Sequence, residues 1–111
     1  MDAIFAIDKP VGPTSHDVVA RIRRSARLRR VGHAGTLDPL ASGVLVVALG
    51  NATRLVEYLT ADDKAYRAVI AFGSETATDD AEGEVTRTGP VDHLDATVIK
   101  AALHAFRGTI T

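Results

Sequence analysis

A chain of 111 residues with 46% hydrophobic residues and a formal net charge of −1 has the length and composition of one ordinary soluble domain. It contains no cysteine, which excludes a disulfide framework and a thiolate metal site. The N-terminus lacks the basic segment of a secretory signal, and the longest apolar run, residues 44–49, is too short to span a bilayer.

The first quarter of the chain predicts a strand, a turn and a helix. Residues 3–8 suit a short strand, and the Lys-Pro-Val-Gly-Pro stretch at 9–13 ends it because proline and glycine interrupt regular structure. Thr14 and Asp17 then have the spacing of a capping box. The apolar stripe of the helix behind it consists of Val18, Val19, Ile22 and Ala26.

An arginine-rich block follows on this helix. Six of the ten residues from Arg21 to Arg30 are arginine, although residues 1–67 carry a net charge of only +3 and residues 68–111 a net charge of −4. Such a block is typical of a surface that faces a polyanion, and it is equally compatible with a solvated helix face. Arg21, Arg24 and Arg27 fall mostly off the apolar stripe, toward water or a ligand, and are therefore the candidate contacts to the phosphates of a polyanion.

The middle of the chain alternates short apolar segments with glycine-rich connections. Asp38 before a proline resembles a helix N-cap, with Gly43 available to end a single helical turn. Residues 44–49 form a continuous apolar run that predicts a strand buried on both faces. Residues 52–59 suit a short helix, and the alternation over residues 64–72 predicts a strand with Tyr66 on its apolar side.

The last third of the chain is more polar. Residues 73–83 predict an acidic loop, and residues 95–106 predict a helix with Gly108 near its end. The β-prone residues 109–111 look like the start of a strand in an incomplete domain. Together these elements predict an α+β fold, with a mixed, mainly antiparallel sheet and flanking helices.

The segment Gly32 to Gly43 is the most informative for chemistry, since it holds His33 and Asp38 among three glycines. Each residue also has an ordinary interpretation: an Asp-Pro pair is usually a helix cap, a lone histidine in a turn is usually a polar loop residue, and Tyr66 is more often a core or edge aromatic. The four histidines lack metal-ligand spacing, and no phosphate-binding loop, dinucleotide fingerprint or hydrolase elbow is present.

Taken together, the motifs resemble the bacterial TruB-type family of tRNA pseudouridine-55 synthases from Lys9 to about Gly108. Four blocks carry the resemblance: Lys9-Pro-Val-Gly-Pro-Thr-Ser15, Gly32 to Gly43 with Val44-Leu45, Gly50-Asn-Ala-Thr-Arg54, and Lys64-Ala-Tyr66 leading to Gly73. The Gly-His-x-Gly-Thr-Leu-Asp-Pro core is highly specific. The resemblance implies a pseudouridine synthase-like catalytic core, of which residues 1–111 would be the N-terminal part, without the remainder and a C-terminal RNA-binding domain.

The resemblance also implies roles for individual residues. Asp38 matches the catalytic aspartate, His33 the histidine that inserts into the T loop, and Tyr66 the tyrosine that stacks on the flipped uracil. Lys9 and Pro10 match a motif that supports the active-site loop. An arginine that pairs with the aspartate in this family would lie beyond residue 111.

The expected function is therefore isomerisation of uridine 55 in the tRNA T loop to pseudouridine, by base flipping and rearrangement of the glycosidic bond. We expect no cofactor, no metal and no membrane, with the tRNA T-arm as partner of a cytoplasmic monomer. Two alternatives stay open: a non-catalytic RNA-binding or RNA-folding module, with residues 1–111 inactive alone, and an interaction domain with no RNA role.

Overall fold

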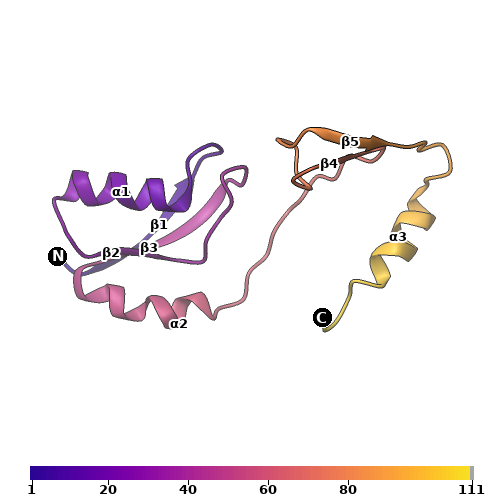
Figure 1. Cartoon of the computed structure of the whole chain (residues 1–111). Helices are drawn as coiled ribbons and strands as arrows, with labels where there is room; N and C mark the ends of the chain where they lie inside the picture. Colours follow the sequence, from indigo (N-terminus) through magenta and orange to yellow (C-terminus); the bar gives the residue numbers. More distant parts are fainter. Residues whose placement is uncertain (111) are drawn as a thin grey trace. The chain divides into compact units, whose positions relative to one another are not determined.

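The computed structural model describes residues 1–110. The chain divides into two compact units, Met1–Ala65 and Tyr66–Thr111, each of which combines helices with antiparallel strands (Figure 1). The predicted α+β class is therefore confirmed.

The first unit contains a three-stranded antiparallel sheet. Its strands are β1 (Ala3–Lys9), β2 (Val31–Ala34) and β3 (Gly43–Leu49), in the order β1-β3-β2. In the register Ile7 lies opposite Leu45, and His33 lies opposite Val47. The last strand in sequence is thus the central strand, and the connection from β2 to β3 lies at one end of the sheet (Figure 1).

Helices cover both faces of this sheet. Helix α1 (Ser15–Ala26) packs on one face, where the buried core consists of Val18, Val19, Val31, Leu45, Val47 and Leu49. The 3-10 helix η1 (Gly50–Leu55) and helix α2 (Val56–Thr60) lie against the other face. A Cβ atom at Gly32 would lie at ordinary contact distance, 3.7 Å, from Cγ2 of Val56, so α2 packs directly against β2. The strand predicted over residues 44–49 is confirmed, although Val44 is 69% exposed.

The start of α1 is built as its sequence predicts. The Thr14 hydroxyl accepts a hydrogen bond from the Asp17 N–H at 2.9 Å, and the Asp17 carboxylate accepts one from the Thr14 N–H at 3.0 Å. These two bonds complete a capping box. The helix ends at Ala26, and the left-handed backbone of the next residue, Arg27 (φ 55°), turns the chain so that the Leu28 N–H donates to the Arg23 carbonyl at 3.2 Å.

Two local predictions in the first unit need correction. Residues 38–43 form no helical turn: the Ala41 N–H donates to the Asp38 carbonyl at 2.9 Å, which is the bond of a β-turn. Over the predicted helix at 52–59, the chain instead begins in η1 and continues in α2. Both stretches are only one or two turns long. In such short segments helix propensity contributes little, so contacts with the neighbouring backbone decide which conformation forms.

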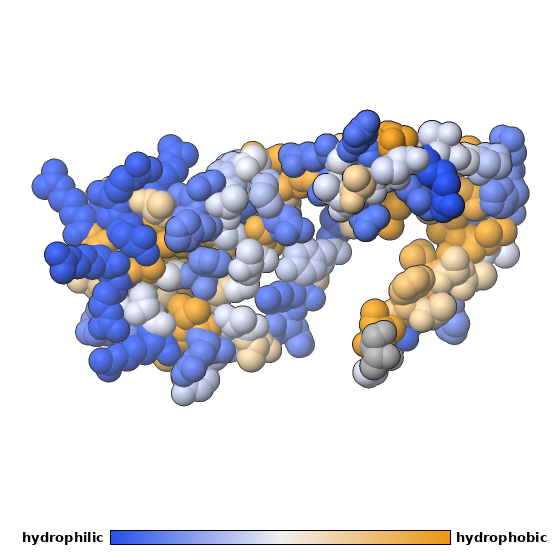
Figure 2. Space-filling model, viewed as in Figure 1, coloured by the Kyte–Doolittle hydropathy of each residue, from blue (hydrophilic) through white to orange (hydrophobic). Residues whose placement is uncertain are grey.

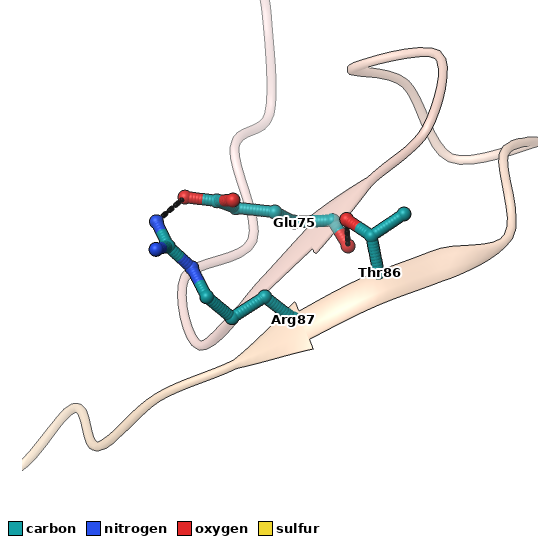
Figure 3. Close-up of polar contacts among 3 residues, drawn as sticks. All are labelled: Glu75, Thr86 and Arg87. Atoms are coloured by element: carbon teal, nitrogen blue, oxygen red, sulfur yellow. Dashed lines mark hydrogen bonds and ion pairs between the residues drawn. The ribbon is translucent and has the colours of Figure 1, made fainter.

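The second unit contains a hairpin where the sequence indicates a polar loop. Strands β4 (Ser74–Thr76) and β5 (Val85–Thr88) pair antiparallel. Arg87 forms an ion pair with the Glu75 carboxylate, and the Thr86 hydroxyl donates to the Glu75 carbonyl at 3.4 Å (Figure 3). In the connection, the Asp80 carboxylate accepts bonds from the Thr78 hydroxyl and from two backbone N–H groups. The loop prediction is therefore wrong at its strand-forming first residues.

The strand predicted over residues 64–72 is also absent. Its apolar side chains are exposed, with Val69 96% exposed and Phe72 53% exposed. Helix α3 (Ala96–His104) is present and capped by Asp95, but Leu103 on its apolar side is 51% exposed. A strand needs a neighbour for its backbone hydrogen bonds, and none pairs with this segment within residues 1–110. Residues 109 and 110 form no strand, and Thr111 lies outside the described residues.

Candidate functional site

The turn that carries Asp38 lies in the connection between β2 and β3. Asp38 is exposed, and within residues 1–110 its carboxylate has no hydrogen-bond or ion-pair partner. The backbone of the turn is closed by the bond from the Ala41 N–H to the Asp38 carbonyl. A carboxylate in this position is open to a ligand, while its backbone is held in one conformation.

A buried lysine supports this turn from below. Lys9, at the end of β1, is fully buried, and its ammonium donates to the carbonyls of Ala41 at 2.6 Å, Pro10 at 2.9 Å and Pro39 at 3.4 Å. Removing an ammonium from water costs several kcal/mol, which hydrogen bonds to a charged donor offset at about 1.5–3 kcal/mol each. The predicted support of the loop by the Lys9-Pro10 block is confirmed by these contacts.

Two further residues of the same block anchor the turn. The Gly12 N–H donates to the Pro39 carbonyl at 2.8 Å. The buried Ser15 hydroxyl donates to the Leu37 carbonyl at 3.0 Å and accepts from the Leu37 N–H at 2.9 Å. The sequence assigned no role to Ser15; the signal was its place in the same motif as Lys9. The turn is thus fixed on both sides of Asp38.

His33 lies on β2, five residues before Asp38. It is half-buried, and its Nδ1 atom is buried without a hydrogen-bond partner within residues 1–110. Since β2 pairs with the central strand, the backbone under the imidazole is held by the sheet. His33 thus lies next to the last residue of β2, and Asp38 lies in the connection that follows this strand.

The candidate phosphate contacts differ from their neighbour Arg23. Arg21, Arg24 and Arg27 are exposed, whereas the Arg23 guanidinium donates to the carbonyls of Arg29 at 3.2 Å and Val31 at 3.1 Å. Figure 2 shows long hydrophilic side chains at the left, over the C-terminal part of α1 and its connection to β2. At 1.5 Å per residue, the three exposed arginines lie roughly 9 to 18 Å along the helix from Ser15.

Tyr66 is the first residue of the second unit. It is 67% exposed and belongs to no helix or strand. An open hollow of about 600 Å³ in the second unit is lined by residues 70–75, 87–91, 93 and 94, and Tyr66 does not line it. The stacking role of Tyr66 stays a prediction.

Residues 1–110 contain no cluster of three or more histidine and carboxylate side chains placed to hold a metal ion. None of the helices described is long and apolar enough to cross a membrane.

The segment that contains the Asp38 turn matches a known protein family. The family model described as TruB family pseudouridylate synthase (N terminal domain) matches residues 23–111. The chain belongs to the TruB family. The matched region contains β2, the Asp38 turn and β3, whereas Lys9, Gly12 and Ser15 precede it in the sequence.

Individual relatives agree with the TruB assignment. The chain is 56% identical to tRNA pseudouridine synthase B of Thermobifida fusca over 98% of its own length and 37% of that protein's length. It is 53% identical to tRNA pseudouridine synthase B of Mycobacterium tuberculosis over 96% of this chain and 36% of that protein. The chain thus spans little more than a third of the curated relatives it matches.

A solved structure is also similar. A chain in the structure of an H/ACA RNP bound to a substrate RNA containing 2'-deoxyuridine is 57% identical, with a TM-score of 0.50. The match covers 50% of this chain and 18% of that chain. It supports a partial pseudouridine synthase core for this TruB domain.

Proposed function

We propose that the protein converts uridine to pseudouridine in tRNA, at position 55 of the T loop, with Asp38 as the catalytic carboxylate. The observation that carries the proposal is the exposed Asp38 carboxylate on a turn fixed by Lys9 and Ser15, in a chain of the TruB family. The names of the relatives support tRNA as the substrate. The T-loop position rests on the motif resemblance.

The target uridine must leave its RNA loop before a protein carboxylate can reach its sugar. Extrusion costs a few kcal/mol, and groups that fill the vacated space or hold the base offset that cost. His33 is proposed to insert into the loop, supported by a backbone that is paired in the sheet. Tyr66 is proposed to stack on the uracil, since aromatic stacking stabilises a flipped base by about 1–3 kcal/mol.

The reaction exchanges one bond to the sugar for another. The bond from N1 to C1′ breaks, the uracil turns and a bond from C5 to C1′ forms. The proton on C5 is released and N1 takes up a proton, so that the product is an isomer of the substrate. An ionised Asp38 carboxylate could act as a nucleophile at C1′ or as a base that removes a proton. Both routes need the open carboxylate that the turn presents, and neither consumes an oxidant or an energy source.

The exposed arginines Arg21, Arg24 and Arg27 are proposed to bind phosphates of the RNA backbone at some distance from the target nucleotide. Arg21, Arg24 and Arg27 lie on a helix whose N-terminal end contacts the Asp38 turn through Ser15. Their distance from that end suits phosphates of the T-arm rather than the flipped base itself. Such contacts make binding weaker as salt rises. We further propose that the protein acts as a cytoplasmic monomer, which gel filtration and fractionation would test.

The test uses tRNA labelled with tritium at uracil C5 and the full-length protein. Wild type should release the label, and Asp38→Asn should reduce release at least 1,000-fold while it still binds tRNA, because the amide keeps the size but not the charge. A tRNA with cytidine at position 55 should release no label from the T loop. Release by Asp38→Asn at the wild-type rate would remove Asp38 from its role. Binding without release by wild type would favour the RNA-folding module.

A further inference from the structure

The end of one lysine side chain lies on the backbone between His33 and Asp38. Gly35 has φ +73°, and a Cβ atom built there would lie 3.1 Å from Nζ of Lys64 and 3.2 Å from its Cε. Lys64 follows α2 in the sequence and belongs to the first unit. Its ammonium therefore lies beside the β2–β3 connection, in the space that a side chain at position 35 would fill.

This ammonium has no partner among the described residues. Within residues 1–110, Lys64 makes no hydrogen bond and no ion pair, and its side chain is exposed. Lys9 in the same unit is the opposite case, since it is buried and donates to three carbonyls. One lysine thus has its donors used by the protein, and the other keeps three donors available at the surface of the site.

We propose that Lys64 is an RNA-binding residue of the site and that its ammonium binds a backbone phosphate beside the flipped uridine. This inference rests on the proposed function. A compact ammonium on a flexible stem suits a phosphate, which accepts charged hydrogen bonds from several directions. Flipping turns the base outward but leaves the phosphates in the chain. A cation beside Gly35, on the segment that joins His33 to Asp38 in the sequence, is therefore placed to meet the backbone of the displaced nucleotide.

The absence of a side chain at Gly35 allows the end of Lys64 to lie against the backbone there. Any other residue at φ +73° is strained, and its Cβ atom would also push on the end of Lys64. The glycine therefore leaves room for the ammonium as well as permitting the backbone conformation. This second requirement could not be read from the sequence, because residues 35 and 64 are brought together only by the fold.

The experiment measures tRNA affinity against salt concentration with full-length protein, in an Asp38→Asn background that prevents turnover. Lys64→Gln should weaken binding about 5- to 20-fold at low salt and lower the slope of log K against log [salt] by about 0.7 to 0.9, the value for one lost phosphate contact. Lys64→Arg keeps the charge and should keep the slope. Lys100→Gln, the same charge change at an exposed position of α3, is the matched control.

A parallel thermal unfolding curve separates binding from structure. Lys64→Gln should leave the unfolding temperature unchanged, since Lys64 has no bond to lose among the described residues. An unchanged salt slope in Lys64→Gln would overturn the inference, and so would a slope that falls equally in Lys100→Gln. If the wild-type protein releases tritium while Lys64→Gln keeps its slope, the inference fails and the proposed function stands. If wild type releases none, the proposed function fails whatever Lys64 does.

Discussion

The Nζ atom of Lys9 lies 2.6 Å from the carbonyl oxygen of Ala41, across 32 positions of sequence. The bond joins the end of β1 to the far side of the turn that carries Asp38. A buried cation therefore fixes the backbone of the candidate catalytic residue without touching its carboxylate.

Lys9→Met should destabilise the protein and reduce its activity. Methionine has nearly the same length but no donors, so it leaves the carbonyls of Ala41 and Pro10 without their partner. We expect a loss of about 2 kcal/mol or more in the free energy of unfolding, since an unsatisfied buried polar group costs about 1–3 kcal/mol. Urea unfolding and tritium release measure the two effects. Lys100→Met is the control, and equal stability of the two variants would contradict the role of Lys9.

Ser15→Ala should loosen the other side of the turn. The hydroxyl serves both the N–H and the carbonyl of Leu37, so its removal leaves two backbone groups unpaired. We expect a destabilisation of about 1–3 kcal/mol and a fall in kcat larger than any change in KM. Ser25→Ala changes an exposed serine of the same helix and should be close to neutral. A fall in kcat of similar size in Ser25→Ala would mean that the helix, not the bond to Leu37, is responsible.

The capping box should make stability depend on pH. The backbone N–H and the hydroxyl of Thr14 bond to the Asp17 carboxylate and lower its pKa below the ordinary value of 3.8. Because the folded pKa is the lower one, Asp17 stabilises the fold above pH 3.8, and this contribution disappears as pH falls through the folded pKa. Wild type should therefore exceed Asp17→Asn in urea midpoint at pH 7, and the difference should shrink towards pH 2.

A control for this effect is Asp62→Asn, at an exposed aspartate that makes no hydrogen bond through its side chain among residues 1–110. A pH dependence as large in this control as in Asp17→Asn would mean that the bond to Thr14 is not its cause. A constant difference between wild type and Asp17→Asn from pH 7 to pH 2 would contradict the prediction.

Adjacent arginines on α1 should behave differently. Arg24→Gln should weaken tRNA binding and reduce its salt slope by about one phosphate contact, with no change in stability. Arg23→Gln should lower stability by about 1–2 kcal/mol, because the Arg23 guanidinium joins α1 to the carbonyls of Arg29 and Val31. Filter binding and urea unfolding of both variants check this. A salt slope in Arg24→Gln equal to that of wild type would show that the exposed arginines of α1 do not bind phosphates.

Local signals in the sequence predicted the first unit well. The capping box at Thr14, the strand at 3–8 and the apolar run at 44–49 are each decided by neighbouring residues, so their pattern is readable without the fold. The Gly-His-x-Gly-Thr-Leu-Asp-Pro core carries the family resemblance, and that resemblance made Asp38 the candidate carboxylate. The strand predicted over residues 64–72 failed because pairing depends on a neighbour that a single segment does not contain.

The tertiary structure alone decided how the site is held. Lys9 bonds to Ala41 and Ser15 bonds to Leu37, across 32 and 22 positions, respectively. A side chain that bonds to a distant backbone carbonyl leaves no periodic trace in the sequence, because any residue could supply that carbonyl. The sequence therefore determined which carboxylate to expect, and the packing of β1, α1 and the β2–β3 connection determined why its backbone stays in place.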